Sequence, residues 1–133
     1  MTTEEVEAFI DRLYAATAEG DWDTVGAMVT DDLLITEAAG LPMAGEYRGK
    51  NALRDLFVQV FDTLSVAGLD RGQTVVGGDH AGSFVTMRFT GEGLAPAELF
   101  EMFRFRDGKV CEIKPYYFDP APVLAAAAAK QAA

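Results

Sequence analysis

The hydrophobic period of this chain changes once, and that change limits the folds it can adopt. Up to about residue 64, apolar residues recur at helical spacing, and the clearest stripe consists of Leu53, Leu56, Phe57, Val60, Phe61 and Leu64. From residue 71 onward, four segments have strand character: 71–76, 82–90, 98–106 and 109–117. Gly77-Gly78-Asp79 and Asp107-Gly108 predict hairpin turns between them. Helices followed by a run of strands predict an α+β fold, with helices covering one face of an antiparallel sheet.

The N-terminal half is predicted to hold three helices and one short strand. The first helix covers residues 3–19 and ends at Gly20, and a short second helix begins after Asp21 as its N-cap. A strand over 33–37 and a loop over 38–45 separate it from the third helix, at about 50–64. We expect one domain over residues 1–120. The alanine-rich segment 121–133 is expected to be a short helix or disordered.

Charge and cysteine content exclude several classes of function. A formal net charge of -10 repels phosphate backbones and anionic lipid surfaces, so we expect neither a nucleic-acid nor a membrane partner. No apolar run approaches the roughly 20 residues of a membrane helix, and the acidic N-terminus lacks the layout of a signal peptide. Cys111 is the only cysteine, which excludes an internal disulfide and favours a reducing cytoplasm.

The sequence predicts no metal or organic cofactor. One cysteine and one histidine, His80, cannot supply a zinc site. No glycine-rich motif for binding phosphate is present, and Gly77-Gly78 is explained by a turn. Any chemistry must therefore come from side chains alone.

Two glutamates are predicted to point toward the apolar side of the sheet. Because side chains alternate along a strand, Glu101 shares a face with Leu99, Phe103 and Phe105. Glu37 likewise lies on the same face as Leu33 and Ile35. A carboxylate among apolar groups keeps its proton or finds a partner, because burying the bare charge costs several kcal/mol. Two inward acids on separate strands are what a small proton-transfer pocket needs.

The order of elements and several short motifs resemble the NTF2-like superfamily, which includes ketosteroid isomerase and SnoaL-type polyketide cyclases. The motifs are Gly20-Asp21, Asp31-Asp32, Tyr47-Arg48-Gly49-Lys50, Phe103-Arg104-Phe105, Asp107-Gly108-Lys109 and Tyr117-Phe118-Asp119, and they span roughly residues 5 to 120. The resemblance implies a cone in which a curved sheet and three N-terminal helices enclose an apolar cavity. It also implies a homodimer formed through the outer face of the sheet.

The resemblance further implies roles for individual residues. Glu37 matches the proton-shuttling acid of ketosteroid isomerase. Glu101 matches the acid that stays protonated and donates to the substrate oxyanion. Both are Glu rather than Asp, and the extra methylene moves each carboxyl. The tyrosine of the oxyanion hole matches Leu13, with Tyr14 one residue later, and a supporting tyrosine is replaced by Phe57.

The other candidate ligand contacts are Tyr14, Phe57, Phe103, Tyr117 and Arg88. Alternation places Arg88 with Phe84 and Thr86, opposite Val85, Met87 and Phe89; if it pointed inward, it would neutralise Glu101. We expect a protein that binds a small apolar organic molecule and acts on it as an isomerase, cyclase or dehydratase. The alternative is a non-catalytic binding or dimeric assembly module of the same fold.

Overall fold

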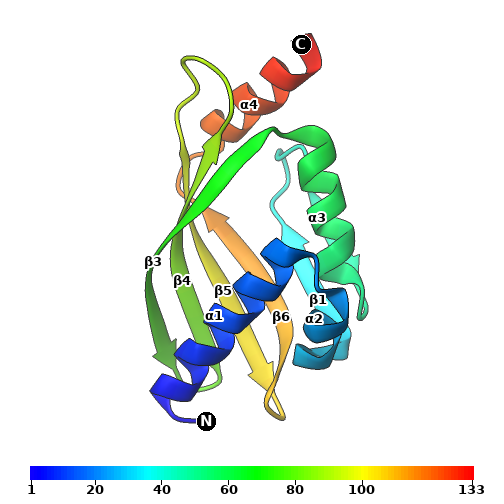
Figure 1. Ribbon diagram of the computed structural model, residues 1–133, viewed down its shortest axis with the longest axis vertical. Coiled ribbons are helices and arrows are strands. Elements are labelled where there is room, and N and C mark those ends of the chain that lie inside the picture. The colour runs from blue at the N-terminus through cyan, green and yellow to red at the C-terminus, as the bar shows by residue number, and fades with distance from the viewer.

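The computed structural model covers residues 1–133 and contains four helices and six strands (Figure 1). In chain order they are α1 (Thr3–Glu19), α2 (Trp22–Met28), β1 (Val29–Glu37), β2 (Gly45–Arg48), α3 (Ala52–Thr63), β3 (Val66–Gly77), β4 (His80–Phe89), β5 (Ala97–Arg106), β6 (Lys109–Tyr117) and α4 (Ala121–Ala132). None of the helices combines the length and apolar character that crossing a bilayer requires.

The six strands form one sheet in the order β2-β1-β6-β5-β4-β3. The predicted antiparallel sheet is in fact mixed, because β1 pairs with β6 in parallel, for example Ile35 with Ile113. Two neighbouring parallel strands need a long connection, and here the elements from β2 to β5 provide it. The sheet twists around α1, which crosses its inner face, while α3 lies over the β1 side (Figure 1).

Local sequence signals explain the boundaries of α1. Thr2 and Glu5 form a reciprocal capping box at its start. Gly20 ends it with φ 69°, in the left-handed region that glycine adopts without strain. The buried residues Val6, Phe9, Ile10, Leu13 and Ala16 recur at helical spacing and face the sheet.

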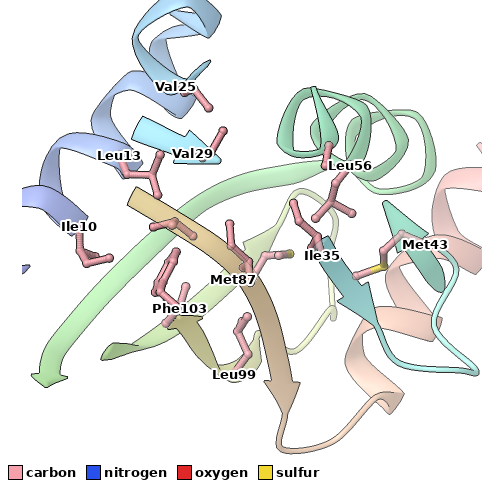
Figure 2. Close-up of a cluster of buried hydrophobic side chains, with 14 of the residues drawn as sticks. Ile10, Leu13, Val25, Val29, Ile35, Met43, Leu56, Met87, Leu99 and Phe103 are labelled. Atoms are coloured by element: carbon pink, nitrogen blue, oxygen red, sulfur yellow. The ribbon is translucent and has the colours of Figure 1, made fainter. Parts of the chain in front are cut away.

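The hydrophobic core lies between α1, α3 and the inner face of the sheet. Figure 2 shows how Ile10 and Leu13 of α1 meet Phe103 of β5, while Leu56 of α3 approaches Ile35 of β1. Phe103 is 2% exposed and Ile35 is fully buried. Val85, Met87 and Phe89 of β4 also belong to this core, so they cannot form an intermolecular face.

Three elements differ from the sequence prediction. β1 begins at Val29 and β3 at Val66, both earlier than expected. β2 was not predicted, and it lies between the end of the predicted loop and the third helix. β2 is an edge strand with mostly exposed residues, so it carries no apolar alternation.

The segment after residue 120 forms helix α4, which buries Val123 and Ala126. Lys130 Nζ donates to the carbonyl oxygens of Phe61 and Leu64, which fixes α4 against the end of α3.

Candidate functional site

A cavity of about 630 Å³ opens between α1, α3 and the inner face of the sheet. Fifteen of its 20 lining residues are hydrophobic, and the charged ones are Asp11, Arg71 and Glu101. This volume falls within the range of roughly 300–1,000 Å³ that small-molecule sites occupy. The cavity can therefore hold a mostly apolar organic molecule beside a small polar group.

Glu101 supplies the carboxyl of the cavity wall. It lies on β5 opposite Ser83 of β4 and Pro115 of β6, on the inner face predicted from alternation. Its carboxylate accepts a hydrogen bond from the hydroxyl of Tyr14. The pKa of Glu101 is raised, because the effect of burial outweighs the opposing effects of the Tyr14 hydrogen bond and the nearby charge of Arg71. The result is a carboxyl at an apolar surface that is held by a specific donor.

Tyr14 comes from α1, which brings its ring onto the inner face of the sheet. Its ring packs edge-to-face against Phe103, with the centroids 5.9 Å apart. Burial, together with the charge of Glu101 and the hydrogen bond to it, raises the pKa of Tyr14. Tyr14 therefore keeps its proton and serves as a donor to Glu101.

Arg71 lies beside Tyr14 and Glu101 and was not predicted as a site residue. Its guanidinium lies 4.0 Å from the centroid of the Tyr14 ring. It donates to Asp11 at 3.0 Å, to Thr74 at 3.2 Å and to Ser83 at 3.4 Å. A register shift between Arg71 and Thr74 marks an irregularity in β3 at this position. Such an irregularity is not visible in the pattern of residue types.

Glu37 is the last residue of β1 and is only 4% exposed. Its Oε1 is buried without a hydrogen-bond partner. Burial, reinforced by the charge of Glu101, raises the pKa of Glu37 to about 8. Glu37 is thus electrostatically coupled to Glu101, but it is not among the residues that line the cavity.

The aromatic residues predicted as ligand contacts divide into two groups. Phe57, Phe103 and Tyr14 line the cavity. Phe57 stacks on Phe61 of the same helix, with ring centroids 4.5 Å apart. Tyr117 does not line the cavity, although its burial and the charges of both Glu37 and Glu101 raise its pKa.

Arg88, predicted as a ligand contact, does not line the cavity. Its side chain is half exposed and bonds to Asp70, with a distance of 2.7 Å between Nε and Oδ2. It lies on the outer face of the sheet because its neighbours in β4, Met87 and Phe89, occupy the core. Arg71, and not Arg88, is the cation beside Glu101.

The arrangement provides groups that can take part in acid–base chemistry. No group of three or more His, Cys, Asp or Glu side chains is placed to hold a metal ion. Instead, a carboxyl, a phenol and a guanidinium meet at one wall of an apolar cavity. Such a wall can bind the oxygen of an organic molecule or exchange a proton with it.

Comparison with known proteins places the chain in a family. The SnoaL-like domain family matches residues 10–113. No curated protein matches. An NTF2-like protein from Burkholderia xenovorans LB400 is 23% identical, with a TM-score of 0.76 and coverage of 96% of this chain and 98% of that one.

Two further solved structures share the fold. Bal32a, from a soil-derived mobile gene cassette, has a TM-score of 0.80 at 16% identity, over 93% of this chain and 97% of that one. TerC, co-crystallised with polyporic acid, has a TM-score of 0.76 at 17% identity, over 91% and 96% of the two chains. The match over residues 10–113 establishes that this chain belongs to the SnoaL-like domain family, and the solved structures share its fold.

Proposed function

We propose that this protein binds a small, mostly apolar organic molecule in the cavity and moves a proton on it, as an isomerase or cyclase would. The observation that carries the proposal is the position of Glu101, whose carboxyl faces an apolar cavity and is held by Tyr14. A carboxyl in such surroundings is poised for proton transfer near neutral pH. That TerC was co-crystallised with polyporic acid supports the use of this fold for binding an organic molecule.

In the proposed reaction, a C–H bond next to a carbonyl group breaks. The proton moves to an oxygen of Glu101, and the electron pair of the C–H bond becomes delocalised onto the carbonyl oxygen as an enolate. Return of the proton from Glu101 to a different carbon isomerises the molecule. Attack of the enolate carbon on a second carbonyl of the same molecule closes a ring instead, and the proton returns from Glu101 to the new alkoxide oxygen. Neither route needs an oxidant, a reductant or a second substrate.

Exchange of α-hydrogens tests this proposal directly. Enolisable ketones such as 1-tetralone are incubated with the protein in D₂O, and the loss of the α-proton signal is followed by NMR. We expect exchange faster than in buffer, and a rate at least about 100-fold lower for Glu101→Gln, in line with the usual contribution of a general base. Glu98→Gln is the matched control, because Glu98 lies on the same strand but is exposed on the outer face.

The control variant should exchange like the parent protein. Equal exchange by Glu101→Gln and by the parent protein would remove Glu101 from the chemistry. No exchange above buffer for any ketone in a panel, combined with tight binding of these ketones, would favour the non-catalytic binding module.

We also propose that the protein forms a homodimer through the outer face of the sheet. Phe84, Phe100 and Tyr116 lie side by side across β4, β5 and β6 on this face. Phe84 and Tyr116 are each 53% exposed. Gly82 has no side chain, which leaves room for the ring of Phe100 above it. An aromatic cluster of this kind on a sheet face is typical of an interaction surface.

A further inference from the structure

The two buried carboxyls are joined by the sheet. Glu101 of β5 pairs with Pro115 of β6, and Ile35 of β1 pairs with Ile113 of β6. Ile35 and Ile113 are the last paired residues of β1 and β6, and Glu37 and Pro115 each follow two residues later. With the same register continued, Glu37 and Glu101 flank Pro115 from opposite sides, about 10 Å apart between backbones, with both side chains on the inner face.

The two carboxyls differ sharply in their surroundings. Glu101 accepts the hydrogen bond of Tyr14 and has Arg71 nearby. The Oε1 of Glu37 is buried and has no partner. A negative charge is stabilised by a donor and a cation, whereas a carboxyl without a donor is more stable with its proton. Burial raises the pKa of both carboxyls, but only Glu101 has a donor and a cation that oppose this effect, so the charge belongs on Glu101 and the proton on Glu37.

The other titratable groups that face Glu37 and Glu101 also favour a charge on Glu101 and a proton on Glu37. They come from four elements: Tyr14 of α1, Tyr47 of β2, Arg71 of β3 and Tyr117 of β6. The only cation among them, Arg71, acts on Glu101 and not on Glu37. Burial and the charge of Glu101 raise the pKa of Glu37 to about 8, so Glu37 is mostly neutral at pH 7.

We propose that Glu37 and Glu101 hold one proton between them at neutral pH, which resides on Glu37, so that Glu101 alone presents a negative charge to the cavity. This inference rests on the proposed function only for the role of Glu101 as the group that contacts the ligand. It reverses the roles implied by the resemblance to ketosteroid isomerase. Glu101 becomes the base, and Glu37 becomes a positioning residue that sets the charge of the pair.

A negative charge on Glu101 and a proton on Glu37 also limit which ligands the cavity can bind. The charged side chains of the lining are Asp11, Arg71 and Glu101. With both acids ionised, their charges exceed that of Arg71, so the lining keeps one excess negative charge. A neutral ketone is therefore favoured over a carboxylic acid of the same shape, which would bring a second negative charge into an apolar site.

Titration of the carboxyl groups by ¹³C NMR tests the distribution without any substrate. In the parent protein, two coupled carboxyls give two titration steps, one near pH 8 and one at lower pH. We expect Glu37→Gln to abolish the step near pH 8 and to leave the step at lower pH within about half a pH unit of its place. We expect Glu101→Gln to shift the remaining titration of Glu37 downward by about one unit or more, because the charge of Glu101 is gone.

The opposite pattern would overturn the proposal. If Glu37 carried the charge, Glu101→Gln would preserve the step at lower pH, and Glu37→Gln would remove it and leave a single step at clearly higher pH. If Glu37→Gln fails to fold, Glu37→Leu removes the same proton and the buried polar atoms, and its titration is judged in the same way. Failure of the proton-transfer function would appear in the exchange of ketone α-hydrogens and would leave these titrations unchanged.

Discussion

Replacing Glu37 by Gln should flatten the dependence of folding stability on pH. Burial and the charge of Glu101 raise the pKa of Glu37 from its ordinary value of 4.5 to about 8. The folded chain therefore binds this proton more tightly than the unfolded chain does. The stabilisation from the proton is fully present below pH 4.5 and is lost progressively as the pH rises to about 8.

The magnitude follows from the size of the pKa shift. At about 1.4 kcal/mol per pH unit, the window between 4.5 and about 8 corresponds to a loss of about 5 kcal/mol, of which about 3 kcal/mol is lost by pH 7. Glu37 is 4% exposed, so solvent screening reduces this figure little. The lowered pKa of Asp32, about 2, changes stability only in more acidic solution and is common to both proteins.

Urea unfolding at pH 5, 6, 7 and 8, followed by the fluorescence of Trp22, measures this effect. Trp22 is the only tryptophan and packs against Phe57, so its emission reports on the folded core. We expect the parent protein to lose more stability per pH unit than Glu37→Gln, by about 1.4 kcal/mol per unit. A buried amide carries a cost of its own, about 1 to 3 kcal/mol, but this cost does not depend on pH. Parallel stability profiles for the two proteins would refute the reasoning.

Three further predictions follow from other parts of the structure. Tyr14→Phe removes the donor to Glu101, so the pKa of Glu101 rises, and the pH below which α-hydrogen exchange slows moves upward. An unchanged dependence of the exchange rate on pH would show that Tyr14 does not act on the base. Phe103→Ala should cost about 3 to 5 kcal/mol in urea unfolding, because Phe103 is 2% exposed, and a cost below about 1 kcal/mol would contradict its place in the core. Phe84→Glu should convert a sedimenting dimer into a monomer, whereas a parent protein that sediments as a monomer would disprove the proposed interface through Phe84 and Tyr116.

Hydrophobic periodicity predicted most of the fold, because an element that is buried on one face carries apolar residues at regular spacing. The stripe of α1 and the alternation of β4, β5 and β6 placed these elements within a few residues of their positions. β2 was missed because an exposed edge strand needs no apolar alternation. The first part of β3 was missed because none of its residues is buried, so no apolar alternation marks the strand.

The site was predictable only where it depends on a single strand. Alternation alone indicated that Glu101 faces inward, and the structure places it there. The bond between Tyr14 and Glu101 joins residues 87 positions apart and depends on how α1 is rotated over the sheet. The role of Arg71 depends on an irregular register in β3, which residue types do not reveal. Arg88 was ambiguous because alternation gives two faces without saying which one is covered.

The most direct test of the central claim is the ¹³C chemical shift of the Glu101 carboxyl while 1-tetralone is added at pH 7. If Glu101 is the charged group that meets a neutral ligand in the cavity, its signal moves in proportion to the bound fraction, and the signal of Glu98 stays in place. Saturation of the protein by the ketone with an unmoved Glu101 signal would contradict the account.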